Sequence, residues 1–392
     1  MVGRVSYHGK VAVAAAAMTP LSRESGRTVL SLAAEACRGA IEAAGIDKAE
    51  VNGVAAFSLY DDSVAAESVA GALGLRDLGF VMDFNQGGQS PAFMVMQAAL
   101  AIDAGLADAV LVYRALNGRS GVRVGRAAAR GIGAELRHAA GLIAYPQVTA
   151  LWARRYMIET GATELDMAAA AINARAQAAR NPRALRRAPL DLEQYFASPM
   201  VADPYRAVDC TVEVDGACAL LVTRLDRARD LRLRPAVIAG SGWRTHSFDL
   251  DMASALTYDA PSKNFGWHMK DAFWGGAGYR PEDADVASLY DCFSGVLLQN
   301  MEGMGLCGLG EAGEYLRRKA QGGKGAVVNP SGGLLAEGYL HGMNVVAEAV
   351  WQVQGEAGPT QVQDCEVAVT CTGGHMTGSA LLLTRDFAGA AR

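Results

Sequence analysis

The segment Asn329–Asn344, NPSGGLLAEGYLHGMN, contains the side chains best suited to acid–base chemistry, Tyr339 and His341. Its opening Asn-Pro-Ser-Gly-Gly cannot be helical, because proline lacks an amide donor and glycine permits positive φ. An apolar, strand-like run precedes the segment and an apolar helical pattern follows it. We therefore expect a corner at the carboxyl end of a strand, where α/β proteins place binding and catalytic groups.

Three other loops have the same character, because each follows an expected strand and contains glycine. They are Gln86–Gln89, Tyr290–Gly295 and Cys371–His375. Glycine lets the backbone approach a ligand closely. The loop Gln86–Gln89 also opens a helix, so its free N–H groups and the positive end of the helix dipole are expected to face the ligand. Such donors suit the oxygen of a thioester or of a developing enolate.

These loops belong to a chain in which expected strands and helices alternate, which is typical of βαβ units and a mainly parallel sheet. The apolar helix Ser90–Ala104 is expected near the centre of the core. We expect helices also at Thr28–Gly45, Gly295–Met304 and Met343–Val353, and buried strands at Lys10–Ala17, Val51–Ser58, Phe80–Asn85, Ala107–Tyr113, Thr211–Thr223, Pro235–Gly240, Asp285–Tyr290, Gly325–Val328, Glu366–Cys371 and Ser379–Thr384.

The chain contains an internal likeness that indicates two related halves. Asp215–Arg224 and Thr377–Arg385 both place an apolar run after a glycine and end in Thr-Arg. With the matching order of elements, this favours a duplicated α/β unit. We expect the halves to be residues 1–230 and 231–392, with an arginine-rich loop domain inserted at about 117–204.

Composition excludes several classes of partner. The net charge is −5 and no block of basic residues is present, so nucleic acid is not expected as a partner. No apolar run approaches the roughly 20 residues of a membrane span, and the N-terminus resembles a first strand more than a signal peptide. Seven cysteines without CxxC spacing indicate a reducing cytoplasm and no zinc site.

The order of the four loops resembles the thiolase superfamily, especially the sterol-carrier-protein-type thiolases, over nearly the whole chain. Asn329-Pro-Ser-Gly-Gly with the later Gly-x-x-x-Gly is similar to the loop carrying the Gly-His-Pro motif. Tyr290-Asp-Cys-Phe resembles His-Asp-Cys-Phe, and Cys371-Thr-Gly-Gly resembles the C-terminal Cys-x-Gly motif. The resemblance implies an α/β fold of duplicated βαβαβαββ halves in a five-layered αβαβα core with an inserted loop domain, and a homodimer.

The departures from the thiolase pattern point to a different reaction. Gln86 and its neighbours occupy the place of the nucleophilic cysteine, and Tyr290 and Tyr339 replace two histidines. A thiolase needs a thiolate activated by a base. The combination is similar to the thiolase-fold aldolases of steroid side-chain degradation. It implies retro-aldol cleavage of a bulky tertiary β-hydroxyacyl-CoA, a steroid C17 side-chain intermediate, to a ketone and propionyl-CoA without an acyl-enzyme.

The same resemblance implies a partner, and the chemistry of the retro-aldol step suggests roles for the candidate residues. The partner is an OB-fold and zinc-ribbon protein associated with an enoyl-CoA hydratase, and the chain needs no metal or organic cofactor. Tyr290 is expected as base and Tyr339 as acid, although the reverse assignment is open, with His341 or Asp291 as a proton relay. Backbone of Gln86, Gly87 and Gly373 is expected to bind the thioester oxygen, and Cys371 and His375 complete the expected site.

Other interpretations of these residues stay open at this point. Tyrosines often line pockets, and Asp291 could brace its loop. Cys371 could be a packing residue, and Cys292 is expected in the core. A thiolase or acyltransferase that uses Cys371 predicts inactivation by thiol reagents. A non-catalytic scaffold subunit that binds lipid-CoA esters predicts binding without turnover.

Overall fold

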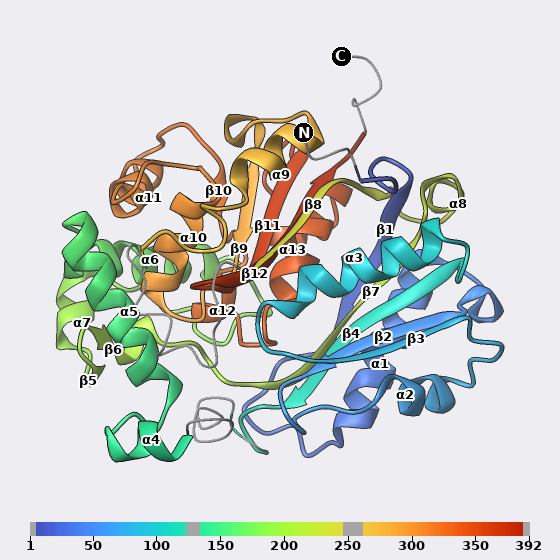
Figure 1. Cartoon of the computed structure of the whole chain (residues 1–392), viewed down its shortest axis with the longest axis horizontal. Helices are drawn as coiled ribbons and strands as arrows, with labels where there is room; N and C mark the ends of the chain where they lie inside the picture. The colour runs from blue at the N-terminus through green and yellow to red at the C-terminus, as the bar shows by residue number, and fades with distance from the viewer. Residues whose placement is uncertain (1–4, 122, 124–133, 246–261, 387–392) are drawn as a thin grey trace.

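The computed structural model describes residues 5–121, 123, 134–245 and 262–386. Within these ranges ten strands form one mixed sheet in the order β10-β9-β11-β12-β8-β1-β7-β4-β2-β3 (Figure 1). The strands are β1 Val11–Met18, β2 Gly53–Ser58, β3 Phe80–Asn85, β4 Ala109–Asn117, β7 Asp215–Arg224, β8 Ala236–Thr245, β9 Val286–Leu289, β10 Val327–Val328, β11 Val367–Gly374 and β12 Thr377–Thr384.

The sheet repeats one strand order twice. The first half runs β3-β2-β4-β7-β1 and the second runs β10-β9-β11-β12-β8, so β7 and β12, which carry the internal likeness, hold equivalent places. The halves meet where β1 pairs antiparallel with β8 through Ala12 opposite Val237. In each half, from the outer edge inward, the first two pairs of neighbouring strands are parallel and the next two pairs are antiparallel. The domain boundary at residue 230 stays a prediction.

Helices form layers on both sides of these strands. α3 (Ser90–Asp103) and α13 (Met343–Gln354) contact strands of both halves. α1 (Val29–Ala44) and α2 (Ala66–Leu73) pack on the first half. α9 (Lys270–Ala277) and α10 (Ser294–Gly303) pack on the second half. The resulting helix–strand–helix–strand–helix arrangement agrees with the expected thiolase-like α/β fold (Figure 1).

Side chains along the central strands point alternately to the two faces of the sheet, so they belong to two separate parts of the hydrophobic core. On β1, Ala12 and Ala14 join the cluster under α1, whereas Val11 and Val13 join the cluster that includes α3 and α13. Successive side chains of a strand point to opposite faces, and the apolar run places both faces in contact with helices.

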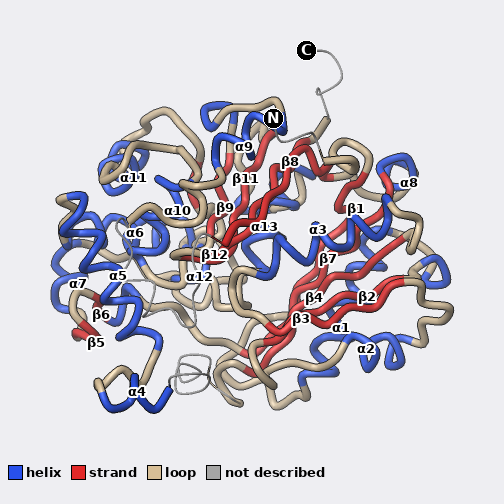
Figure 2. The backbone as a smooth tube through the Cα atoms, viewed as in Figure 1, coloured by secondary structure: helices blue, strands red, loops and turns tan. Residues whose placement is uncertain are grey.

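The segment between β4 and β7 is mainly helical, as Figure 2 shows on the left of the molecule. α5 and α6 pack against α10, so the described part of the insertion lies next to the second half. Residues 122 and 124–133 of the insertion lie outside the described residues. Its elements are α4 Ala134–Ala139, α5 Tyr145–Thr160, α6 Glu164–Ala178, α7 Leu192–Ala197, and the short strands β5 Met200–Ala202 and β6 Tyr205–Arg206.

The structure differs from the sequence-based expectation in several elements. β3 is a half-exposed edge strand and not a buried one, and α3 exposes Leu100. Four helices are absent from the expectation: α2, α8 (Leu225–Arg229), α9 and α11 (Ala312–Ala320). The corner after β10 also contains one short helix, α12 (Gly333–Ala336). None of the seven cysteines forms a disulfide, and no described helix is long and apolar enough to cross a membrane.

Candidate active site

Two tyrosines from different loops of the second half share a hydrogen bond. Tyr290 follows β9, and Tyr339 lies in the corner between β10 and α13. Their hydroxyl oxygens are 2.8 Å apart, and either can donate. Both side chains are buried, with 5% and 6% of the residue surface exposed. The chain therefore holds two phenols in contact at the place where the sequence predicts acid–base groups.

The four predicted loops meet around this pair. A Cβ built on Gly88 would collide with the Tyr290 ring, lying 2.6 Å from Cε2, and one built on Gly373 would lie 3.1 Å from Cα of Gln89. The side-chain amide of Asn300, on α10, donates to the carbonyls of Tyr290 (2.8 Å) and Gly373 (3.1 Å). Glycine at position 88 lets the helix-opening loop lie directly against the phenol.

Two side chains hold the corner that carries Tyr339. Asn329 accepts from the N–H of Leu289 (2.6 Å) and donates to its carbonyl (2.9 Å), so it continues the pairing of β9 and β10. The fully buried carboxylate of Asp291 accepts from the N–H groups of Leu334 (2.7 Å) and Leu335 (3.4 Å) in α12. These contacts favour the bracing interpretation of Asp291.

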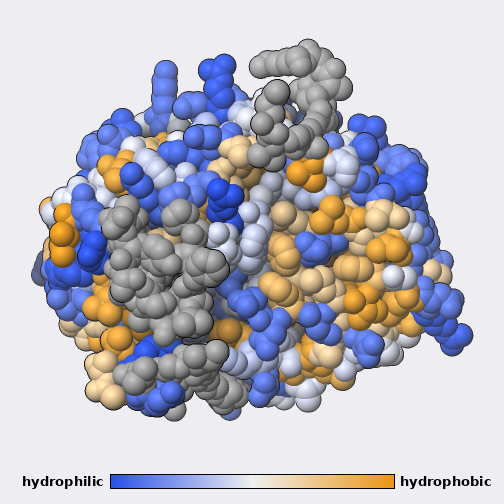
Figure 3. Space-filling view, viewed as in Figure 1, coloured by the Kyte–Doolittle hydropathy of each residue, from blue (hydrophilic) through white to orange (hydrophobic). Residues whose placement is uncertain are grey.

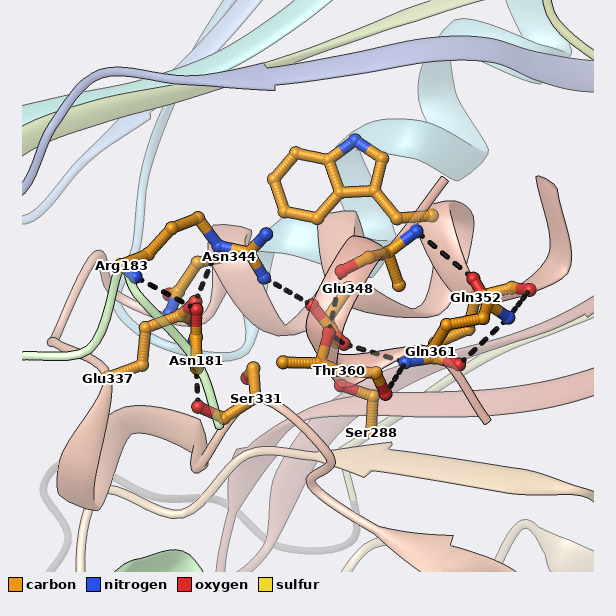
Figure 4. A network of polar contacts seen from close by, with 12 residues as sticks. Asn181, Arg183, Ser288, Ser331, Glu337, Asn344, Glu348, Gln352, Thr360 and Gln361 are labelled. Carbon is orange, nitrogen blue, oxygen red and sulfur yellow. Dashed lines mark hydrogen bonds and ion pairs between the residues drawn. The ribbon is translucent and has the colours of Figure 1, made fainter. Parts of the chain in front are cut away.

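A second polar network fixes the far side of the corner (Figure 4). The buried carboxylate of Glu337 accepts from Asn181 (2.8 Å), Arg183 (3.1 Å) and Asn344 (2.8 Å). Arg183 also reaches the carboxylate of Glu348, at 2.8 Å, on α13. Buried charges are stable only when they are paired. Arg183 supplies the positive charge for both Glu337 and Glu348, which lie on either side of Tyr339 in the sequence or in the helix that follows it.

His341 extends the site toward the first half. Its ring centre is 5.2 Å from that of Tyr339. Arg114, which is fully buried on β4, donates through Nη2 to Nδ1 of His341 (3.1 Å) and pairs with Asp62 (2.5 Å). Burial, and then Arg114, lower the pKa of His341 to about 3.

Burial controls the ionisation of the phenols. Burial and the neighbouring Tyr339 raise the pKa of Tyr290 well above 10. Burial and Cys292 raise the pKa of Tyr339, whereas the hydrogen bond from Tyr290 and the charge of Arg114 act in the opposite direction. Both phenols are therefore neutral near pH 7, and Tyr339 is the one whose ionised form has stabilising neighbours.

The start of α3 differs in part from the expectation of free N–H groups. The N–H of Ala92 donates to Oγ1 of Thr372 (3.2 Å), and that of Phe93 donates to Oγ of Ser379 (3.0 Å). These donors are thus used within the protein. The backbone N–H groups of Gly87 and Gly88 make no hydrogen bond to another described residue.

The remaining predicted residues have different surroundings. Gln86 is exposed and accepts from the amide of Gln89 (2.6 Å). Cys371 is fully buried within β11, and burial raises the pKa of its thiol to about 12. His375 stacks on Trp152 of α5, with ring centres 4.3 Å apart, and burial lowers its pKa to about 3.

Three residues near the two tyrosines were not predicted from the sequence as site residues. Arg114 was detectable, because a charge interrupts the apolar strand run AVLVYRAL. Cys292, expected in the core, is only half-buried and lies beside Tyr290. Tyr145, at the start of α5, is close enough to influence the ionisation of both candidate tyrosines. No spacing in the sequence relates an inserted helix to these loops.

Metal ligands do not gather in the described part of the chain. Within residues 5–121, 123, 134–245 and 262–386, no group of three or more His, Cys, Asp or Glu side chains is arranged to hold an ion.

Comparison with known proteins identifies the family of this chain. The model of the family "Thiolase C-terminal domain-like" matches residues 269–385. The chain is 36% identical to the 17-hydroxy-3-oxo-4-pregnene-20-carboxyl-CoA lyase of Mycobacterium tuberculosis, covering 88% of this chain and 92% of that protein. It is 35% identical to the steroid side-chain-cleaving aldolase of Thermomonospora curvata, covering 96% and 98%.

The solved structures include a protein of the same kind. The Ltp2-ChsH2(DUF35) aldolase superimposes with a TM-score of 0.89 at 33% identity, covering 97% of this chain and 99% of that one. The predicted resemblance, the thiolase-like fold and the class of carbon–carbon lyase are thus confirmed at the level of the family. The chain belongs to the thiolase superfamily, in the branch of thiolase-fold steroid side-chain-cleaving aldolases.

Proposed function

We propose that this chain is a retro-aldolase that cleaves the Cα–Cβ bond of a bulky tertiary β-hydroxyacyl-CoA, a steroid C17 side-chain intermediate, to a ketone and propionyl-CoA. The observation that carries the proposal is the hydrogen-bonded pair of Tyr290 and Tyr339. The names of the two relatives support the steroid acyl-CoA as substrate class.

The pair offers a neutral route for the proton. In a retro-aldol step the β-hydroxyl loses its proton, its oxygen becomes the ketone, and the electrons of the Cα–Cβ bond pass to Cα and the thioester. Tyr290 takes the hydroxyl proton and passes its own proton across the 2.8 Å contact to Tyr339. Tyr339 delivers its proton to Cα. One proton enters and one leaves, so no charge accumulates on the buried pair.

The order of the relay follows from the surroundings of each phenol. Arg114 and the hydrogen bond from Tyr290 favour ionised Tyr339, which makes Tyr339 the better acid. Its neighbour Tyr339 disfavours ionised Tyr290, which makes the Tyr290 oxygen the better base. The His341 ring lies next to Tyr339, with 5.2 Å between ring centres, and its Nε2 lies beside Gly87, so a thioester oxygen bound there would be close to the proposed acid.

The thioester itself accepts the electrons, so the reaction needs no metal or organic cofactor from this chain. The amide groups of Gly87 and Gly88 are available to a developing enolate oxygen. Asp291 then serves as a brace for the corner and not as a proton relay.

One rival function, a thiolase that uses Cys371, has less support. A nucleophilic thiol needs an accessible, readily formed thiolate. The Cys371 thiol is fully buried, and its pKa is raised to about 12. The other rival, a non-catalytic scaffold, predicts binding of the CoA ester without turnover and no loss when Tyr290 or Tyr339 is changed to Phe.

Two partners belong to the proposal. The first is a DUF35 protein, by analogy with the name of the solved aldolase. The family resemblance implies that this partner is of OB-fold and zinc-ribbon type and is associated with an enoyl-CoA hydratase. The second is another copy of this chain. The edge strand β3 exposes alternate side chains, including Val81. Figure 3 shows apolar surface around α3 and β3, where Leu100 and Leu106 are exposed. An unpaired edge beside apolar surface suits strand pairing across a homodimer.

The test is turnover of a tertiary β-hydroxyacyl-CoA steroid with the DUF35 partner and without free CoA. Equimolar ketone and propionyl-CoA are the expected products. Omitting the partner measures its contribution. Product formation only after addition of free CoA would overturn the proposal in favour of thiolysis, and tight binding of the substrate without products would favour the scaffold.

A further inference from the structure

His341 has only one ring nitrogen free to meet a ligand. Nδ1 lies 3.1 Å from Nη2 of Arg114. An arginine side chain can donate hydrogen bonds but cannot accept them, so Nδ1 must be the acceptor in this contact. The proton of the neutral ring is consequently on Nε2, and His341 is a hydrogen-bond donor on its opposite side.

The free nitrogen faces the loop that opens α3. A Cβ built on Gly87 would lie 3.4 Å from Nε2 of His341, which places this nitrogen beside the loop Gln86–Gln89 at Gly87. Nε2 makes no hydrogen bond to another residue in the described ranges. The Nε2–H donor therefore lies beside a loop whose Gly87 and Gly88 amides make no hydrogen bond to another described residue, and the His341 ring packs next to Tyr339.

The neighbours of the ring preserve this state. Arg114 is fully buried, and Asp62 compensates its charge through a contact of 2.5 Å. Phe57 and Tyr339 pack against the ring at 6.0 and 5.2 Å between ring centres. Arg114 disfavours a second positive charge on His341, and its partner Asp62 only partly offsets that effect.

We infer that His341 is a neutral hydrogen-bond donor that binds the thioester oxygen through Nε2–H, and that Arg114 is the positioning residue that fixes this tautomer. The inference rests on the proposed function and changes the role expected for His341. A proton relay needs both ring nitrogens to exchange protons, but Arg114 occupies one of them. A donor aimed at a developing enolate oxygen strengthens as the negative charge grows.

Ring ¹⁵N NMR tests the tautomer without any substrate. The protein carries ¹⁵N-labelled histidine, and the signal absent from the His341→Asn variant identifies the residue. We expect a pyridine-type Nδ1 and a pyrrole-type Nε2, unchanged from pH 8 to pH 5. A proton on Nδ1, or titration near pH 6.5, would overturn the inference whether or not the enzyme turns over.

A matched pair of variants tests the donor in catalysis. His341→Gln keeps an N–H near the position of Nε2, whereas His341→Asn keeps only an oxygen near the position of Nδ1, facing Arg114. Asparagine also tolerates the positive φ of 57° at this position. We expect His341→Gln to lose less than about 10-fold in kcat and His341→Asn to lose about 10²–10³-fold.

The outcomes separate this inference from the proposed function. Equal losses in both variants would contradict the donor role, because neither amide can relay a proton. Wild-type protein that shows the expected tautomer but gives no products without free CoA would contradict the proposed function and leave the assignment of the ring intact.

Discussion

The N–H of Tyr290 donates to the carbonyl of Cys371 at 2.9 Å, while the Cys371 thiol is fully buried. The cysteine thus supports the loop that begins at Tyr290 through its backbone, and its buried side chain is not accessible to a ligand. We predict that Cys371→Ala retains kcat within about 3-fold and that no acyl-enzyme is detected by mass spectrometry. Nucleophilic catalysis by this thiol would instead abolish turnover.

The close approach of the loop Gln86–Gln89 to Tyr290 predicts a steric effect. In Gly88→Ala the new methyl group collides with the phenol ring, so the loop or the ring must move. We expect a loss of at least about 100-fold in kcat, because misplacing a catalytic group by about 1 Å has an effect of that size. Gly275→Ala, on α9 with no heavy atom near the new Cβ, is the control. Unchanged activity of Gly88→Ala would exclude this contact from the site.

The network in Figure 4 predicts a large effect on stability from one arginine. Arg183→Met leaves the buried carboxylates of Glu337 and Glu348 without their cation. We expect the free energy of unfolding to fall by about 3 kcal/mol. Arg180→Met removes an exposed arginine three positions away that donates to Gln177 (2.8 Å), and it should change the free energy of unfolding by less than about 0.5 kcal/mol. Chemical denaturation measures both, and equal effects would refute the role of the network.

The lowered pKa of His375, about 3, predicts a dependence of stability on pH. Between pH 6.5 and pH 3 the unfolded chain binds a proton at this ring and the folded chain does not. The free energy of unfolding therefore falls as the pH decreases through this window, by about 1.4 kcal/mol per pH unit for the ring. His375→Asn should reduce that slope between pH 6 and pH 4. An unchanged slope would mean that the folded protein protonates His375.

Much of the fold was predictable because its signals are local. Thr28 and Gly45 end α1 at the expected places, since the threonine hydroxyl accepts from the N–H of Ser31 (3.1 Å) and the glycine adopts a φ of 70°. The edge position of β3 was not predictable, because its apolar residues resemble those of a buried strand. Burial of an edge depends on strand order, which no local pattern contains.

Part of the candidate site was also predictable from the sequence, and part of it was not. Tyr290 and Tyr339 stand out in the sequence because each stands where the similar thiolase motif has a histidine, in a loop that follows an expected strand. Their direct contact, at 2.8 Å, depends on how two loops pack. The pairing of Arg114 with His341 joins residues 227 positions apart, on β4 and in the corner before α13. Only the folded chain shows that this pairing leaves Nε2 as the free nitrogen.

The central claim is that Tyr290 and Tyr339 act as one proton-transfer unit. A double-mutant cycle on kcat tests it with Tyr290→Phe, Tyr339→Phe and the double variant, and with Tyr315→Phe as a buried control whose hydroxyl bonds Ala326 at 3.0 Å. We predict that each single variant loses about 10²–10⁴-fold and that the double variant loses little more. Multiplicative losses, or either single variant within a few-fold of wild type, would contradict the claim.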